Sequence, residues 1–317
     1  MRFNPKARLD SSQVQNRRGS GGGGGGGLGF PVGGGGGGGG GMKVGGGIGG
    51  ILILVLIFVV SQYLGGGGGG LPAGPASDDQ PVSTGSQELA HCKTGADANN
   101  DPDCARVAMV NSIQSYWAQA LPQQSNKQYV EADTVIFSNQ VRTGCGNATS
   151  DVGPFYCPPD QHVYLDTTFF KDMLERQLGG KATDFTEAYV LAHEYGHHIQ
   201  NLLGTMGRVR TQQGASSDAV RLELQADCYA GMWARHASEV QDADGQVFIE
   251  NLTQQDVEEA IAAARAVGDD RIQQRTSGRV NPDSWTHGSA EERMRWFTTG
   301  REKGTLQACD TFSARRL

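Results

Sequence analysis

Residues 190–200 read VLAHEYGHHIQ, a half-apolar stretch that contains His193, Glu194, His197 and His198. Side chains four residues apart lie on one face of a helix, one turn from each other, so the rings of His193 and His197 can converge on one point. Two imidazoles at that spacing are half of a tetrahedral zinc site, and Glu194 can reach a water on the metal without being a ligand. The HExxH pattern also arises by chance, so a third ligand is needed.

The helix that carries this pattern is expected to cover about residues 184–203, with Thr183 or the next residue as its N-cap and Gly204 as its stop. His198 points roughly 100° away from the metal-facing side, which favours packing over metal binding. Gly196 costs the helix about 1 kcal/mol relative to alanine, a cost that close approach of another backbone would explain.

A third ligand is available in RLELQADCYAG, residues 221–231. This segment is expected to lie in a second helix, over about residues 217–239, where Glu223 and Asp227 project from one face. Glu223 can supply a carboxylate oxygen, and Asp227 can accept a hydrogen bond from the other ring nitrogen of a zinc-bound histidine. The alternative is a solvated acidic face. The ligand interpretation is favoured by apolar neighbours, namely Leu222, Leu224, Ala226 and Tyr229.

The composition of residues 91–317 is that of one ordinary domain. The expected elements are a helix over residues 104–120, strands over residues 129–141 and 162–169, the two helices above, a helix from the capping box at Thr253 to near Gly268, and a last helix from Ser289. A small sheet followed by helices indicates an α+β fold.

The N-terminal part differs in composition. Of the 48 glycines, 30 lie in the first 80 residues, mostly in runs typical of flexible coil. Residues 44–64 form an uncharged apolar run, about long enough to cross a membrane as a helix. Residues 1–43 carry a net charge of +5, and no Lys or Arg follows the run before Lys93. The positive-inside rule therefore predicts a single-pass anchor in the inner (cell) membrane, with residues 1–43 in the cytoplasm, a linker over residues 65–90 and an extracytoplasmic, periplasmic domain.

Residues 44–317 carry a net charge of −12, which argues against nucleic acid as a partner because phosphate binding requires the opposite sign. All six cysteines lie in this part, as suits disulfides in an oxidising compartment. The sequence does not choose among the possible pairings. We favour Cys145–Cys157, which brackets a loop with Gly and Pro, followed by Cys92–Cys104 and Cys228–Cys309.

Several segments resemble the bacterial neutral zinc metallopeptidase family, whose HExxH…ExxxD pattern is similar to that of the gluzincins. They are GCG…GPFYCP (144–158), LAHEYGHHIQNLLG (191–204), RLELQADCYAG (221–231), AIAAARAVGDDR (260–271) and PDSWTHGS (282–289). The resemblance covers the chain from about residue 140 to the end, and the anchor as an architectural feature. It implies a single-pass membrane protein with a zincin-like fold that hydrolyses peptide bonds.

The resemblance also draws attention to THGSAEER, residues 286–293. In other anchored gluzincins a His-Pro segment, followed by an Arg six residues after the His, lies beside the metal. His287 and Arg293 have that interval here, with Gly288 in place of the proline. One of the two is expected to stabilise the oxyanion that forms when water adds to a carbonyl. The alternative is a capping or salt-bridging pair at the start of the last helix.

The sequence therefore predicts a membrane-anchored zinc peptidase that acts on peptides or proteins. His193, His197 and Glu223 are expected to hold Zn²⁺, and Glu194 to take a proton from the attacking water and deliver it to the leaving amine. The strand over residues 162–169 is expected to hold an extended substrate by edge pairing.

Two other interpretations compete with this one. Two histidines and a carboxylate also form the facial triad of non-haem iron oxygenases, although such sites do not need a glutamate beside the first ligand. A non-catalytic zinc-containing envelope interaction module would keep the same ligands, but it would have no need to retain Glu194. The sequence defines neither the substrate nor the oligomeric state.

Overall fold

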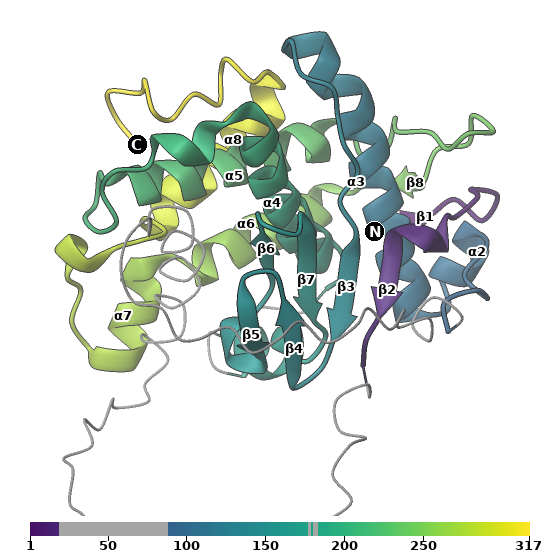
Figure 1. Cartoon of the computed structure of the whole chain (residues 1–317), viewed down its shortest axis with the longest axis horizontal. Coiled ribbons are helices and arrows are strands. Elements are labelled where there is room, and N and C mark those ends of the chain that lie inside the picture. Colours follow the sequence, from purple (N-terminus) through teal and green to yellow (C-terminus); the bar gives the residue numbers. More distant parts are fainter. Residues whose placement is uncertain (19–87, 177–178, 180–182) are drawn as a thin grey trace, which may run out of the picture.

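The computed structural model describes residues 1–18, 88–176, 179 and 183–317. Its central sheet has four strands in the order β2-β3-β7-β6, with β2, β3 and β7 parallel and β6 antiparallel to β7 (Figure 1). Helices α4 to α8 all follow β7 in the chain, with the short strand β8 between α5 and α6, as the α+β prediction requires. The strand bounds are Val14–Asn16 for β2, Thr134–Phe137 for β3, His162–Asp166 for β7 and Phe155–Cys157 for β6.

Five of the described helices correspond to the five that the sequence predicts: α3 (Pro102–Gln124), α4 (Asp184–Leu203), α5 (Asp218–His236), α6 (Gln254–Ala266) and α8 (Ala290–Lys303). The sequence missed α2 (Gly95–Ala98) and α7 (Asp269–Ser277). It also missed two antiparallel pairs, β1 (Arg2–Phe3) with β8 (Ile249–Asn251) and β4 (Gln140–Thr143) with β5 (Gly146–Thr149).

Helix boundaries follow from capping side chains. The Thr183 hydroxyl accepts a hydrogen bond from the backbone N–H of Thr186, and α4 ends at Gly204, whose φ of 77° is a left-handed conformation suited to glycine. The same kind of side-chain cap begins three later helices, at Ser217 for α5, Thr253 for α6 and Ser289 for α8. The boundaries predicted at these positions are confirmed.

The strands are shorter than expected because polar turns interrupt them. Asn139 has a φ of 68°, which ends β3 and turns the chain into β4. β7 ends at Asp166, whose carboxylate accepts a 2.8 Å hydrogen bond from the backbone N–H of Thr168. β7 pairs with β3 on one side and with β6 on the other, so the edge pairing predicted for it is wrong. The edge next to it in the described sheet is β6.

Glycines let the long helices approach each other closely. A Cβ at Gly196 in α4 would lie 2.9 Å from the carbonyl oxygen of Ala226 in α5. At the crossing of α5 and α8, a Cβ at Gly231 would meet the Phe297 carbonyl, and one at Gly300 would meet the Cys228 carbonyl. The predicted close backbone approach at Gly196 is therefore confirmed, and α5 is held between α4 and α8 (Figure 1).

Three disulfides join the described cysteines, and all three favoured pairings are confirmed: Cys92–Cys104, Cys145–Cys157 and Cys228–Cys309. Cys145 lies in the turn between β4 and β5, so its disulfide fastens that hairpin to β6. Cys228 lies in α5, where its disulfide fastens the helix to the C-terminal segment.

Residues 1–18 pack into the domain. β2 extends the central sheet by pairing with β3, and β1 pairs with β8. Asn16 donates a 2.6 Å hydrogen bond to the carboxylate of Glu88, and Arg18 forms an ion pair with Asp103. The described residues that flank the segment 19–87 are therefore held close together on the domain.

The membrane location predicted from the sequence is corrected by this structure. In residues 1–18, 88–176, 179 and 183–317, none of the helices combines the length and the apolar character that a crossing requires. The apolar run 44–64 and most of the predicted linker lie outside the described residues. The predicted topology also conflicts with the pairing of β2 and β3, because a single crossing between them would put the two strands on opposite sides of a membrane.

Candidate metal centre

α4 and α5 bring the three predicted ligands together. The rings of His193 and His197, one helical turn apart, have centroids 4.8 Å apart. The Glu223 carboxylate lies between them, with one oxygen 3.2 Å from Nε2 of His193 and the other 3.3 Å from Nε2 of His197. The three side chains form a compact cluster of potential metal ligands that is shielded from solvent.

This donor set fits a zinc ion. Metal–ligand bonds of about 2.0–2.1 Å at tetrahedral angles separate two ligand atoms by roughly 3.4 Å, which matches the nitrogen–oxygen spacings at Glu223. Two imidazoles and one carboxylate are also the protein ligands that catalytic zinc sites use, with a fourth position left for water or substrate. Among the described residues, the other cluster of ligand types contains Cys92 and Cys104, whose sulfurs are tied up in a disulfide.

The outer nitrogen of each ring is held by a hydrogen-bond acceptor. Nδ1 of His193 lies 2.8 Å from an Asp227 carboxylate oxygen, and Nδ1 of His197 lies 2.8 Å from the Gln200 amide oxygen. An acceptor at Nδ1 places the ring proton there and leaves the Nε2 lone pair directed at Glu223. Both imidazoles are therefore oriented as metal ligands.

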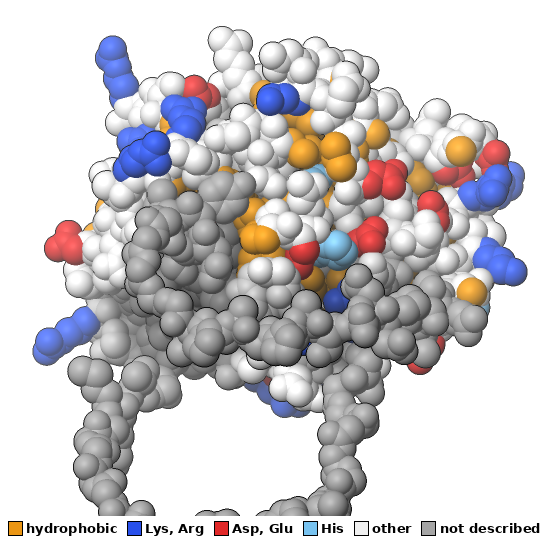
Figure 2. Space-filling model, in the orientation of Figure 1, with side chains coloured by type: hydrophobic (Ala, Val, Ile, Leu, Met, Phe, Trp, Pro, Cys, Tyr) orange, Lys and Arg blue, Asp and Glu red, His pale blue; other side chains and the backbone are white. Residues whose placement is uncertain are grey.

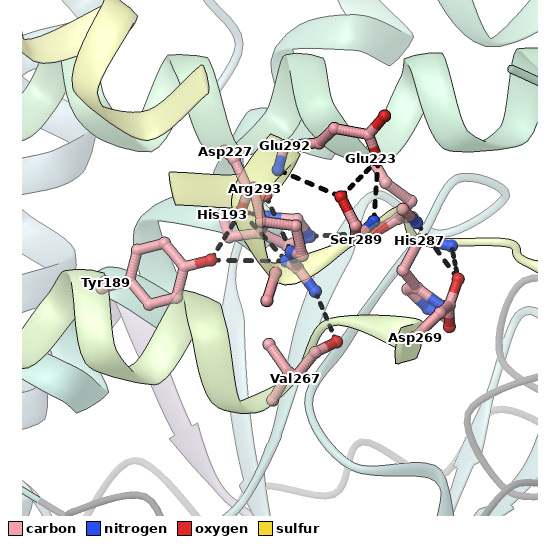
Figure 3. A network of polar contacts seen from close by, with 12 residues as sticks. Tyr189, His193, Glu223, Asp227, Val267, Asp269, His287, Ser289, Glu292 and Arg293 are labelled. Atoms are coloured by element: carbon pink, nitrogen blue, oxygen red, sulfur yellow. Dashed lines mark hydrogen bonds and ion pairs between the residues drawn. The ribbon is translucent and has the colours of Figure 1, made fainter. Parts of the chain in front are cut away.

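Asp227 is the centre of a buried polar network (Figure 3). Its side chain is 0% exposed and accepts hydrogen bonds from the Tyr189 hydroxyl at 2.6 Å and from Arg293 Nε and Nη2 at 2.8 and 3.0 Å. Burial opposes ionisation, but Arg293 and His193 lower the pKa of Asp227 to about 2. Asp227 is thus a permanent anion that joins α4, α5 and α8 beneath the cluster.

The electrostatics of the centre favour a positive charge between the rings. Burial alone would lower the pKa of His193, but the carboxylates of Asp227 and Glu223 raise it to about 10. Burial opposes ionisation of Glu223 as well, yet the surrounding imidazoles hold its pKa well below the ordinary value. The ionised carboxylates of Asp227 and Glu223 lie against the imidazole rings. They stabilise a positive charge between the rings, which can be a proton or a metal cation.

Glu194 lies next to the cluster and is 8% exposed. In the described part of the chain, no protein group donates a hydrogen bond to its carboxylate. Burial raises the pKa of Glu194, although the imidazoles of His193 and His197 partly oppose this. A buried carboxylate with a raised pKa and no protein donor is suited to accept and return a proton.

His287 lies in the loop before α8 and lines the same pocket as the cluster. Its Nδ1 is 2.8 Å from the Thr286 hydroxyl and 3.4 Å from an Asp269 carboxylate oxygen. The other Asp269 oxygen accepts hydrogen bonds from the backbone N–H groups of Thr286, His287 and Gly288, which fixes the loop. Burial lowers the pKa of His287, but the carboxylates of Glu223 and Asp269 outweigh burial and raise it.

Arg293 lies in the first turns of α8, and its guanidinium is fully engaged by protein groups. Nε and Nη2 donate to Asp227, Nη2 also donates to Tyr189, and Nη1 donates to the Val267 carbonyl at 3.3 Å (Figure 3). Of the two roles that the sequence left open for Arg293, the structure shows the salt bridge.

The remaining polar residues of this region hold the fold together. His198 is buried between the Tyr156 hydroxyl and the Val130 carbonyl, and burial lowers its pKa to about 4. The Tyr195 hydroxyl bonds to Ala132. These contacts lie on the side of α4 away from the cluster, which agrees with the expected packing role of His198.

Sequence reasoning missed three residues that support the centre. Gln200 lies three residues after His197, a spacing at which helical side chains meet, so that signal was available. Asp269 belongs to the GDDR segment, but nothing local indicates that it reaches the loop of residues 286–288. Tyr189 precedes His193 by four residues and shares its face, yet an aromatic residue there reads as core.

A pocket of about 100 Å³ opens beside the cluster. Its lining includes polar residues of the centre, among them Glu194, Glu223 and His287. Most of the remaining lining is apolar and comes from α4, α5, β6 and the neighbouring loops, namely Val152, Pro154, Phe155, Phe169, Val190, Met206, Leu222 and Val267. The centre is therefore accessible to a ligand from this pocket.

Comparison with known families accounts for nearly the whole chain. The family described as "Putative neutral zinc metallopeptidase" matches residues 1–312. The chain belongs to this family. The match includes residues 1–18, in agreement with their place in the domain.

Similar proteins occur in distant bacteria. The uncharacterized protein Rv2575 of Mycobacterium tuberculosis (strain ATCC 25618 / H37Rv) is 53% identical over 232 residues, which cover 73% of this chain and 77% of that protein. The uncharacterized protein YpfJ of Escherichia coli (strain K12) is 39% identical over 239 residues, which cover 73% of this chain and 79% of YpfJ. No solved structure matches the chain.

Proposed function

We propose that this protein is a zinc-dependent peptidase, with His193, His197 and Glu223 as zinc ligands and Glu194 as the general base. The observation that carries the proposal is the convergence of two imidazoles and one carboxylate from two helices, beside a buried glutamate that receives no hydrogen bond from the described residues. Membership in a zinc metallopeptidase family supports it. The proposal includes the identity of the three zinc ligands and a zincin-like fold.

Zinc bound at this position would lower the pKa of its water ligand towards about 7 and polarise the substrate carbonyl. Glu194 accepts the proton of the water as its oxygen attacks the peptide carbonyl carbon. Glu194 then delivers that proton to the amide nitrogen as the carbon–nitrogen bond breaks. The raised pKa of Glu194 suits both steps, because the protonated acid must persist long enough to serve as a donor.

His287 and Arg293 take different parts in the proposed mechanism. The His287 imidazole lines the pocket, and its Nδ1 is engaged by Thr286 and Asp269, so its Nε2 is the nitrogen left to donate a hydrogen bond to the oxygen that becomes negative in the transition state. Arg293 acts as a positioning residue, because it reaches the centre through Asp227 and His193. An extended substrate would pair with β6, whose Phe155 and Tyr156 line the pocket.

The decisive experiment compares the wild type with Glu194→Gln. We expect equal zinc content by elemental analysis and a loss of peptide hydrolysis of about 100- to 10,000-fold, since general acid–base catalysis contributes that much. Glu291→Gln is the matched control, because Glu291 lies on the surface at the start of α8 and should leave turnover unchanged. Removal of the metal with a chelator should abolish hydrolysis, and added zinc should restore it.

Three outcomes would overturn the proposal. Full activity of Glu194→Gln would show that the base is assigned wrongly. Zinc bound with no hydrolysis of any member of a peptide library would identify the non-catalytic interaction module instead. Iron in the purified protein in place of zinc would favour the oxygenase interpretation.

A further inference from the structure

We propose that the apolar residues of the pocket lining, called the apolar wall below, select peptides in which the residue adjoining the cleaved bond carries a large aliphatic side chain. This inference rests on the proposed function, because it names the substrate class of the same site. It depends on the apolar residues that make up most of the lining outside the centre and that have no chemical role in the proposed mechanism.

Within the described part of the chain, the apolar wall offers no charged partner for a charged side chain. Its residues come from several elements, with Phe155 on β6, Phe169 after β7 and Val190 on α4. The charged side chains that line the pocket belong to the centre and its supports, and the hydroxyl of Tyr156, which also lines it, bonds to His198 and Asn201. On the face shown in Figure 2, hydrophobic side chains likewise gather close to a histidine and to acidic side chains. A charged group on this wall would lose its hydration without compensation, whereas an apolar group would gain.

The apolar wall is held rigidly by backbone packing and by a disulfide. Gly153 has a φ of 76°, and a Cβ there would come within 3.1 Å of the Phe169 ring, so the backbone of residues 152–154 lies directly on that ring. β6 directly follows this segment, and the disulfide Cys145–Cys157 fastens the last residue of β6. A fixed wall discriminates between side chains by shape, because it cannot relax around a poor fit.

The size of the pocket sets an upper limit on the side chain. A cavity of about 150 Å³ holds one benzene ring in another protein, so the pocket of about 100 Å³ has room for one aliphatic side chain but is too small for an aromatic ring. The pocket adjoins Glu194 and the ligands directly, so the side chain that fills it must belong to a residue beside the attacked carbonyl. Pairing of the peptide backbone with the edge strand β6 would place the same residue at the pocket.

The test uses fluorescence-quenched peptides that are identical except at the residues on either side of one cleavable bond. We expect kcat/KM to be about 10- to 200-fold higher for Leu than for Ala at the selected position, as for other apolar pockets, lower for Phe than for Leu, and lowest for Asp or Lys. Mass spectrometry of the products identifies the cleaved bond. It therefore shows on which side of that bond the residue that binds in the pocket lies.

Variants of the wall should change the preference in opposite directions. Phe169→Leu gives more room and should raise kcat/KM for Phe relative to Leu peptides. Val190→Phe fills the pocket and should lower kcat/KM for both relative to Ala. Phe170→Leu is the matched control: Phe169 and Phe170 are adjacent and 6% and 5% exposed, but Phe170 does not line the pocket. Its preference should equal that of the wild type.

Each outcome bears on one proposal alone. Hydrolysis that Glu194→Gln abolishes, but that shows equal kcat/KM for Leu, Ala and Asp peptides, would overturn this inference and leave the peptidase assignment intact. A preference that Phe169→Leu and Phe170→Leu alter equally would also overturn it. Absence of any hydrolysis would count against the proposed function itself.

Discussion

The two histidines of the candidate centre are held by partners of different kinds. His193 is held by Asp227, an ionised and fully buried carboxylate that also binds Tyr189 and Arg293. His197 is held by the neutral amide of Gln200, which lies on the same helix and donates in turn to the Leu222 carbonyl. Ring orientation is therefore secured by a charged network on one side and by a neutral amide on the other.

The difference separates two tasks. A hydrogen bond that the ring donates to either partner fixes the ring proton and the direction of Nε2. The charged partner of His193 also makes that ring more basic, and it does so at the cost of burying a carboxylate, which Arg293 offsets. We therefore expect metal affinity and folding stability to depend together on Asp227, and Gln200 to contribute mainly through orientation.

The largest effect should come from Asp227→Asn, which leaves Arg293 as an unpaired buried charge. We expect the free energy of unfolding to fall by about 3–5 kcal/mol and zinc affinity to fall by about 10- to 100-fold. Chemical denaturation and competition with a zinc chelator measure the two quantities. Asp244→Asn is the control, since Asp244 is 53% exposed in its ion pair with Arg8 and should change stability by less than about 1 kcal/mol.

A double variant separates the effect of the Asp227 charge from its support of the His193 ring. Because Asn can still accept the His193 hydrogen bond, the double change Asp227→Asn with Arg293→Met should recover much of the lost stability but little of the zinc affinity. Recovery of both would mean that Asp227 acts on the metal only through the fold.

A smaller effect is expected for Gln200→Leu, which removes the neutral support. Nδ1 of His197 and the Leu222 carbonyl each lose a partner, so stability should fall by about 1–3 kcal/mol. Zinc affinity should fall by roughly 10-fold, at the lower end of the range for such supports. An equal or larger loss of zinc affinity than in Asp227→Asn would refute the division of tasks.

Tyr189→Phe should have the smallest effect of the three. It removes the hydrogen bond that the hydroxyl donates to Asp227 and the longer one that it accepts from Arg293, while Asp227 keeps its bonds to His193 and Arg293, so we expect a loss of about 1.5 kcal/mol. Zinc affinity should change by only a few-fold. A change in the pattern of peptide cleavage would be unexpected, because the hydroxyl bonds to Asp227 and Arg293.

The part of the site that the sequence predicted is the part encoded by short spacings. The positions of His193 and His197, and of Glu223 and Asp227, follow from the helical repeat alone. Caps at Thr183 and Gly204 fixed the limits of α4 for the same reason. The favoured disulfides Cys92–Cys104 and Cys145–Cys157 join residues only 12 positions apart, so local loop composition was informative.

What the sequence could not predict depends on contacts between distant segments. Residues 14–16 pair with residues 134–136, and no local pattern in a basic, glycine-rich neighbourhood indicates a strand there. The apolar run 44–64 and the charge asymmetry around it were the signals available, and they favoured a tail across a membrane. The bond between Arg293 and Asp227 joins residues 66 positions apart, so no local pattern indicated it, and the family resemblance suggested a catalytic role where the structure shows a salt bridge to Asp227.

The contact between Gly196 and Ala226 makes the centre inseparable from the helix pair that carries it. A Cβ at Gly196 would lie only 2.9 Å from the Ala226 carbonyl oxygen, so the backbones of α4 and α5 are closely packed at this point. The two helices cannot slide past each other without moving His193 and His197 away from Glu223. Hydrogen exchange at the amides of this crossing should then proceed through global unfolding alone, and the metal site should disappear in the same cooperative event as the core.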